Sequence, residues 1–148
     1  MKVIIVNPSE KPPIASKDLQ ILTQKICDYF LTKKLKNKSF LKRAKELTLV
    51  FLNASEMKKI NRQFRNKNKP TDILSFSSPD LQSLGELLLC VDVLKKQAKN
   101  QKHSLKSEIS YMLIHGILHL LGYDHEVSPQ EEKTMFNLQD NCFKELGF

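Results

Sequence analysis

Three of the chain's four histidines lie within eleven residues, in the segment HGILHLLGYDH from His115 to His125. On a helix, residues i and i+4 project from the same face, so His115 and His119 can bind one ion together. Gly122 allows the chain to reverse and to bring His125 back toward the pair. Zinc takes nitrogen ligands in a tetrahedral arrangement, and three protein ligands leave a fourth position for water, as in catalytic sites. The spacing therefore predicts one catalytic zinc ion (Zn2+) per chain, bound by His115, His119 and His125.

Gly116 occupies the position at which a common zinc motif carries its catalytic glutamate. The pattern HxxxHxxGxxH has the ligand spacing of metzincin metalloproteases, and in HExxH enzymes the glutamate after the first histidine is the general base. Without that carboxylate the usual route of peptide hydrolysis lacks its proton acceptor, which argues against a peptidase. The alternative interpretation is that Gly116 simply lets another element pack close to the helix.

Two acidic residues near the histidines are candidates for proton transfer. Asp124 is adjacent to His125, and it could equally be a carboxylate that orients a metal-bound histidine. Glu108 precedes His115 by two helical turns on roughly the same face, and it could equally be a favourable charge near the helix start. The proton acceptor therefore stays unassigned, and His103 is interpreted as an ordinary surface histidine.

The net charge of +8, from 24 basic and 16 acidic residues, favours polyanionic partners. A lysine-rich genome composition would explain the total, but the distribution is uneven. Residues 33–45 contain seven basic and no acidic residues, and residues 58–69 contain six and none. We expect nucleic acid rather than a membrane as the partner, because no basic amphipathic anchor is visible at either terminus.

Only three arginines occur in the chain, and two of them, Arg62 and Arg65, lie one helical turn apart just before the tripeptide PTD. The planar guanidinium group of arginine binds two phosphate oxygens at once, which lysine cannot do. From the residues alone, a phosphate-binding site and a solvated basic helix face are both open.

Hydrophobic periodicity predicts the elements that must position these residues. Strands are expected over 2–6, 46–53, 72–78 and 85–91, the first of them at a sheet edge. Helices are expected from Ser16, over 55–65, 92–101 and 104–121, and after Pro129, with Ser16, Ser55 and Ser104 as N-caps and Gly122 in a left-handed C-terminal cap. Strands come early and helices late, so we predict an α+β fold: a small mixed four-stranded sheet packed with about five helices, one of them a zincin-like metal helix.

Length and composition predict a single domain over residues 1–148. A chain of 148 residues with 41% hydrophobic residues can form one core, and no linker or repeat interrupts it. Cys27, Cys90 and Cys142 are odd in number and far apart, which favours buried, reduced thiols in a cytoplasmic protein. No apolar run reaches transmembrane length, and the four apolar residues 3–6 are too few for a signal-peptide core.

HGILHLLGYDH closely resembles the HGxLHLxGYDH signature of the YbeY family of bacterial metal-dependent ribonucleases. The resemblance spans about residues 46–126 and includes three further blocks, LNASEMKKINRQFRNKNKPTDILSFS (52–77), GELLLCVDV (85–93) and KSEISYMLIHG (106–116). The chain departs from the family at two places. Glu86 stands where an aspartate is common, and residues 66–69, which precede Pro70, lack the aspartate that the family tends to carry there.

The resemblance implies that the three histidines bind zinc and that Arg65 matches the family's functionally important arginine. We therefore expect Arg65 to hold the scissile phosphate, with Arg62 as the second candidate. The implied activity is metal-dependent endonucleolytic hydrolysis of single-stranded RNA, in 16S rRNA 3′-end maturation and ribosome quality control. The implied partners are ribosomal RNA, the small ribosomal subunit and its associated proteins, and neither DNA nor a membrane is expected.

Two functions of other classes remain as alternatives. A metalloprotease is suggested by the ligand spacing, but Gly116 and the lack of a recognisable Met-turn count against it. A non-catalytic RNA-binding or ribosome-assembly factor with a structural zinc would need a fourth protein ligand. No cysteine stands at ligand spacing near residues 115–125. The coordination of the bound metal would distinguish the catalyst from the scaffold.

Overall fold

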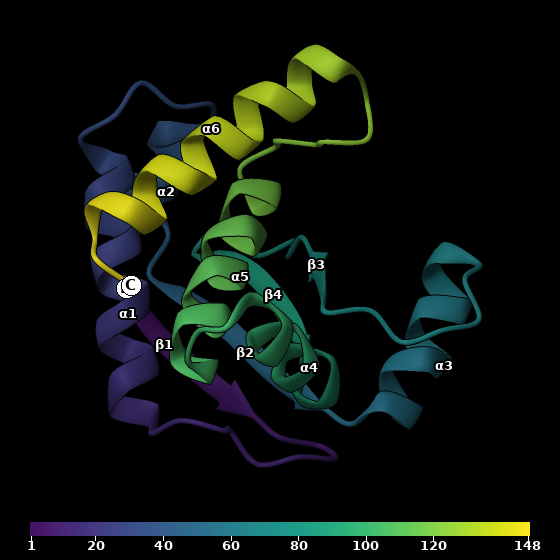
Figure 1. The fold of residues 1–148 in the computed structure, drawn as a ribbon. Coiled ribbons are helices and arrows are strands. Elements are labelled where there is room, and N and C mark those ends of the chain that lie inside the picture. The colour runs from purple at the N-terminus through teal and green to yellow at the C-terminus, as the bar shows by residue number, and fades with distance from the viewer.

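The computed structural model describes residues 1–148 and contains four strands and six helices (Figure 1). The strands are β1 (Lys2–Val6), β2 (Glu46–Leu52), β3 (Ile73–Phe76) and β4 (Ser83–Cys90). The helices are α1 (Ser16–Leu31), α2 (Lys38–Arg43), α3 (Ala54–Arg65), α4 (Val91–Gln101), α5 (Leu105–Leu120) and α6 (Pro129–Glu145). Every predicted strand and helix is present, so the predicted α+β class is confirmed.

Helix α2 is the one helix beyond the expected number, and it lies inside the basic block 33–45. Its six residues bury only Leu41. So short an element has no repeating apolar pattern from which a helix could be predicted. Asn37, the residue before it, adopts the left-handed conformation with φ of 53°.

The sheet is mixed, as predicted, with the strand order β1-β2-β4-β3. Strands β1, β2 and β4 are parallel, whereas β3 runs antiparallel to β4. The central strands β2 and β4 have nearly continuous apolar sequences and are buried on both faces. The shorter strands β1 and β3 form the two edges, which confirms the edge position predicted for residues 2–6.

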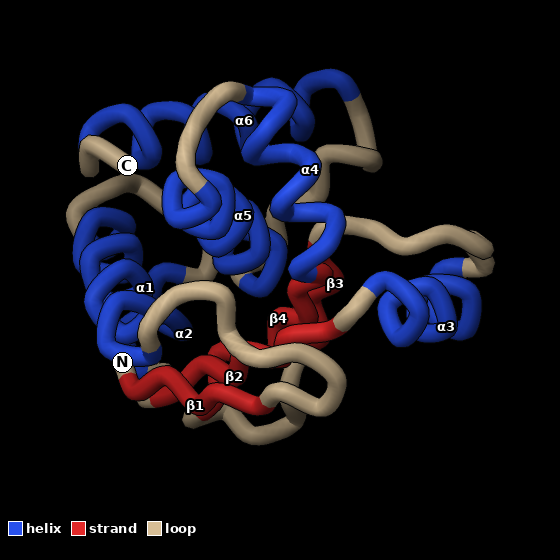
Figure 2. The backbone as a smooth tube through the Cα atoms, turned by 60° about the horizontal axis from the view of Figure 1, so that its bottom comes forward, coloured by secondary structure: helices blue, strands red, loops and turns tan.

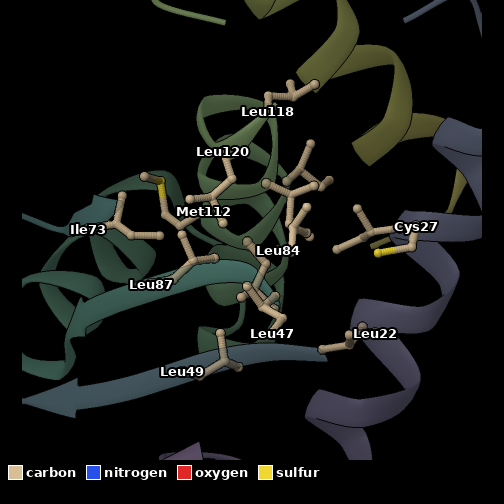
Figure 3. Packing of buried hydrophobic residues seen from close by; sticks show 14 of the residues in the cluster. Leu22, Cys27, Leu47, Leu49, Ile73, Leu84, Leu87, Met112, Leu118 and Leu120 are labelled. Atoms are coloured by element: carbon tan, nitrogen blue, oxygen red, sulfur yellow. The ribbon is translucent and has the colours of Figure 1, made fainter. Parts of the chain in front are cut away.

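Successive residues of the central strands point to opposite faces of the sheet, where they contribute to two separate hydrophobic clusters. Leu47 and Leu49 of β2 belong to a cluster of 27 buried residues, to which α1, α5 and α6 also contribute (Figure 3). Val50 and Leu52 belong to a second cluster of six residues, which includes Met57 of α3. Helix α5 packs against β3, β4, α4 and α6, whereas α3 lies at the side of the molecule (Figure 2).

Helix α5 is anchored in the core along most of its length, because eleven of its sixteen residues are buried. Ser104 caps its N-terminus, where the hydroxyl oxygen accepts a hydrogen bond from the backbone N–H of Ser107 at 3.0 Å. Gly122 follows its C-terminus with a φ of 100°. Both predicted caps of this helix are confirmed, so the residues that follow it leave in a fixed direction.

The other two predicted N-caps are wrong. Asn53 caps α3, since its side-chain oxygen accepts a hydrogen bond from the backbone N–H of Glu56 at 2.9 Å. Asn53 comes directly after β2, so the helix begins early enough to include Ser55. Helix α1 begins after Ala15 with no side-chain cap, and Ser16 is its first residue.

None of the six helices is both long and apolar enough to cross a membrane. Cys27, Cys90 and Cys142 are buried and unpaired, as predicted. Cys27 and Cys142 belong to the larger hydrophobic cluster and Cys90 to the smaller one. The three thiols therefore serve as apolar packing residues.

Candidate active site

The three predicted metal ligands converge at the C-terminal half of α5. His115 and His119 project from the helix and His125 returns from the segment after it, so that one ring nitrogen of each lies within 4.8 Å of the others. The ring centroids of His115 and His119 are 4.8 Å apart, and that of His125 lies 5.2 and 5.4 Å from them. A tetrahedral ion with nitrogen ligands at about 2.0–2.1 Å separates its ligand atoms by about 3.4 Å. Small movements of the rings therefore suffice to bind a metal ion.

The turn that returns His125 is held by two residues before α2. The side-chain amide of Asn37 donates a hydrogen bond to the carbonyl oxygen of Leu121 at 2.8 Å. The hydroxyl oxygen of Tyr123, a buried residue, accepts a hydrogen bond from the backbone N–H of Lys36 at 2.9 Å. The segment between α1 and α2 thus fixes both sides of the turn, a contact across more than 80 residues that no local pattern indicates.

Gln139 of α6 orients His115. Its side chain is fully buried, its Oε1 lies 2.9 Å from the Nδ1 of His115, and its Nε2 donates to the carbonyl oxygen of Tyr111 at 3.3 Å. Because the amide nitrogen is committed to Tyr111, Oε1 must accept, and Nδ1 of His115 must carry the proton. The lone pair of Nε2 then stays free for a metal ion, which is the usual role of a hydrogen-bond partner behind a histidine ligand.

The two helical histidines are held in the neutral form that binds metals. Burial is the main cause that lowers the pKa of His115, opposed by its hydrogen bond with Gln139. Burial, followed by the proximity of His115 and His125, lowers the pKa of His119 to about 4. The Nδ1 of His125 is buried and has no hydrogen-bond partner. Uncharged imidazoles and an unsatisfied ring nitrogen together form a donor set that fits a divalent cation.

Gly116 faces the sheet rather than the metal site. A Cβ at this position would lie 2.8 Å from a methyl group of Leu87 and 2.9 Å from one of Ile73. The glycine therefore lets α5 approach β3 and β4 closely, which is the packing role considered above. A glutamate here would enter the packed core, so this position cannot supply the general base of an HExxH protease.

The histidines and Arg65 line the same cavity, which has a volume of about 790 Å³. Arg65 stands at the end of α3, and its Nη2 lies 3.0 Å from Oε1 of Glu126, the residue after His125. Arg62 does not line this cavity. The structure therefore brings Arg65, and not Arg62, to the side of the metal ligands.

The loop after α3 is fixed by Asn61, a buried residue. Its side-chain amide donates to the carbonyl oxygen of Lys69 at 2.8 Å, and its backbone carbonyl oxygen accepts from the backbone N–H of Lys67. Asn66 ends the helix in the left-handed conformation. Arg65 therefore projects from a well-defined helix end, and Lys67 and Lys69 line the cavity beside it.

One wall of the cavity is acidic. Glu108 is buried, with one carboxylate oxygen 2.6 Å from Nε2 of His103 and the other 3.3 Å from Nε2 of Gln97. The amide of Gln97 also donates to Asp72 at 3.3 Å. Our interpretation of His103 as an ordinary surface residue is wrong, because 28% of its side chain is exposed and its ring is paired with Glu108.

Asp124 also lines the cavity, but its hydrogen bond goes to the backbone N–H of Glu126 at 2.9 Å. It shapes the turn that carries His125, and no hydrogen bond joins it to a histidine. Three of the residues that the sequence did not indicate, Asn37, Gln97 and Gln139, are uncharged amides. The one available signal was Gln139, a polar side chain among the apolar residues of the last helix.

Comparison with known proteins gives the family. The model of the family described as Endoribonuclease YbeY matches residues 4–147. An endoribonuclease YbeY of Bdellovibrio bacteriovorus is 48% identical over 149 residues, covering 99% of this chain and 95% of the relative. Relatives of the same name from Persephonella marina and Staphylococcus carnosus are 43% and 40% identical, over 68% and 69% of this chain and 70% and 72% of their own.

The fold has a solved counterpart in a solution structure of a protein from Thermotoga maritima. The two structures match with a TM-score of 0.60 and 28% sequence identity, over 97% of this chain and 87% of the other. The family match extends over nearly the whole chain, and nearly half of the residues are shared with one relative along that length. The chain therefore belongs to the YbeY family of endoribonucleases.

Proposed function

We propose that this protein is a zinc-dependent endoribonuclease that hydrolyses single-stranded RNA. The observation that supports it most is the shared cavity, in which three histidines stand near an arginine. Such a cavity combines ligands for a Lewis acid with a donor for phosphate oxygens. RNA as the class of substrate follows from membership of an endoribonuclease family.

His115, His119 and His125 would hold one zinc ion, since three imidazole nitrogens are a common catalytic ligand set for this metal. When bound, the ion would supply Lewis acidity beside the scissile phosphodiester bond. Gln139 keeps the lone pair of His115 directed away from α6, and the fixed turn after Gly122 keeps His125 beside the pair. The chain thus arranges its ligands in advance.

Arg65 would bind the scissile phosphate and stabilise the charge that develops on its oxygens. The guanidinium group is now paired with Glu126, and the two side chains are 35% and 55% exposed. A pair this open to water contributes only about 0–1 kcal/mol to stability. A phosphate group can therefore replace Glu126 at little cost and receive the bidentate hydrogen bonds that arginine offers.

We further propose that the single domain of residues 1–148 acts in the cytoplasm on ribosomal RNA. Its task would be 16S rRNA 3′-end maturation and ribosome quality control, with the small ribosomal subunit and its proteins as partners. The resemblance of HGILHLLGYDH to the family signature supports this role. The acid-free basic blocks suit a polyanion, and three buried unpaired thiols suit a reducing compartment.

The test is cleavage of RNA by purified, zinc-loaded protein together with a metal count. We expect cleavage of a single strand, and of an rRNA precursor with an extended 3′ end, but not of the same sequence in a duplex. The variants His115→Ala, His119→Ala and His125→Ala should each lose the metal and the activity. Stoichiometric zinc in all three variants, or equal cleavage of single and double strands, would refute the proposal.

The scaffold alternative differs in how the metal is coordinated. His115, His119 and His125 form the one group of three or more potential ligand side chains whose ligand atoms all lie within 4.8 Å of one another. This group contains no cysteine or carboxylate. X-ray absorption spectra of the zinc protein distinguish the two. A shell of three protein nitrogens and one exchangeable position would favour the catalytic function. A closed shell of four protein ligands would favour a non-catalytic RNA-binding factor.

A further inference from the structure

Phe64 is the only exposed phenylalanine among the eight in the chain. Its residue surface is 60% exposed, and it stands at the end of α3 immediately before Arg65. Its ring contacts the ring of Phe76 edge to face, with centroids 5.2 Å apart and an interplanar angle of 72°. Phe76, at the end of β3, is partly buried and packs on the smaller hydrophobic cluster.

An isolated exposed apolar side chain is common on protein surfaces, so exposure alone indicates no function. The position of Phe64 is what distinguishes it. The cavity of the histidines is lined by five consecutive residues, 71–75. Neighbouring residues of a strand point to opposite faces, so the cavity follows the free edge of β3. Phe76 is the next residue along that edge, and Phe64 adjoins Arg65, which lines the cavity.

The surroundings of Phe64 are rigid and basic. Asn66 closes the helix end two residues later, and the loop beyond it is fixed by the two hydrogen bonds of Asn61. Residues 62–69 are all exposed and include four basic residues and no acidic one. A protein partner would have to bury these charges, whereas a polyanion gains from them. The occupant that this surface favours is therefore a nucleic acid.

We propose that Phe64 is a stacking platform for a nucleobase of single-stranded RNA. It takes the base of a nucleotide next to the phosphate that Arg65 binds, so the inference rests on the proposed function and deepens it. Proteins that bind single strands stack unpaired bases on aromatic rings, and every base offers a face for this contact. A base that is paired in a duplex cannot reach the ring. The platform thus contributes to a preference for single strands without selecting a particular base.

The first test measures cleavage of single-stranded RNA in single turnovers, with the concentration of zinc-loaded enzyme varied. Stacking on one ring is worth about five- to 150-fold in affinity, so Phe64→Ala should raise the half-saturating concentration by that factor. Phe64→Leu, which is apolar but not aromatic, should behave like Phe64→Ala, and Phe64→Trp should match the parent. Leu81→Ala is the matched control, because Leu81 is 69% exposed and lies outside the cavity.

The second test locates the stacked base. An abasic nucleotide is placed at each position of the RNA in turn, and the half-saturating concentration is measured for the parent and for Phe64→Ala. At one position near the cleavage site the missing base should weaken the parent but not the variant, because both changes remove the same contact. If the abasic nucleotide weakens binding equally in parent and variant at every position, the proposal that Phe64 stacks on a base is wrong.

The third test uses fluorescence, because the chain contains no tryptophan. Phe64→Trp introduces a single indole, and single-stranded RNA should quench its emission while a duplex of the same sequence does not. RNA that binds without quenching, or Phe64→Ala that binds like the parent, would overturn the inference while the nuclease stands. A zinc-loaded parent that fails to cleave RNA would refute the proposed function instead, whatever the fluorescence shows.

Discussion

The substitution Gln139→Leu tests how the metal site is constructed. Gln139 is fully buried, and its side chain connects the Nδ1 of His115 with the carbonyl oxygen of Tyr111. Leucine has a similar volume, so the packing of α6 on α5 should survive. The change removes the acceptor that keeps the proton on Nδ1. In the metal-free variant the proton can move to Nε2, the nitrogen that must bind the ion.

The expected effect is therefore on metal affinity. A bound ion forces the proton back to Nδ1, where the buried N–H now lacks an acceptor. An unpaired buried group of this kind costs about 1–3 kcal/mol, which corresponds to a loss of roughly five- to 150-fold in affinity. Loss of a hydrogen-bond partner behind a metal ligand costs about 10–100-fold in other sites. Both estimates predict a clearly measurable change.

Zinc affinity is measured by competition with a chelator of known strength, alongside circular dichroism to follow the fold. Gln139→Glu keeps an acceptor for His115 and should retain most of the affinity. Asn141→Leu is the matched control, because it removes an exposed amide from the same helix. If Gln139→Leu is folded and binds zinc within about twofold of the parent, the assignment of Gln139 as the residue that orients His115 is refuted.

Three further predictions concern catalysis, stability and the turn. Arg65→Lys should lower the single-turnover cleavage rate about 10²–10³-fold, because lysine lacks the planar fork. The cleavage rate of Arg62→Lys should stay within about twofold of the parent rate. Equal cleavage rates for the two variants would remove Arg65 from the mechanism. The metal-free protein should be most stable above about pH 6.5 and lose stability toward about pH 4, because folding lowers the pKa of His115 and lowers that of His119 to about 4. The unfolded chain then binds protons that the folded chain does not, and a urea midpoint that does not change over this range would contradict the prediction. Gly122→Ala should lower the free energy of unfolding by roughly 1–2 kcal/mol, since its φ of 100° disfavours a side chain. The zinc affinity of this variant should fall as well. If its urea unfolding and its chelator titration both match those of the parent, the turn tolerates alanine and the prediction is wrong.

The convergence of the three histidines could be predicted because their arrangement is local. His115 and His119 are related by the period of one helix, and Gly122 is the single conformational requirement for the return of His125. The sheet was predictable for a similar reason, since continuous apolar runs mark strands that are buried on both faces. The order β1-β2-β4-β3 was not, because it depends on crossovers between strands.

The residues that complete the site come from distant parts of the chain. Asn37 holds the turn after α5, Glu126 pairs with Arg65, and Gln139 binds His115. These contacts depend on how α2, α3 and α6 pack, which periodicity does not specify. His103 and Glu108 are only five residues apart in the sequence, yet their contact also depends on the turn between α4 and α5. Local patterns therefore predicted that the three histidines lie together but not the residues that contact them.

The position of Gln139 in the chain has a consequence for protein synthesis. The residue that orients His115 is made 24 positions after it, in the last helix. A ribosome releases the N-terminal part of a chain first, so the strands and α5 emerge before α6. During that interval all three histidines are present, but nothing fixes the tautomer of His115. The oriented metal site is complete only when α6 has packed, so a growing chain that has not yet reached α6 lacks it.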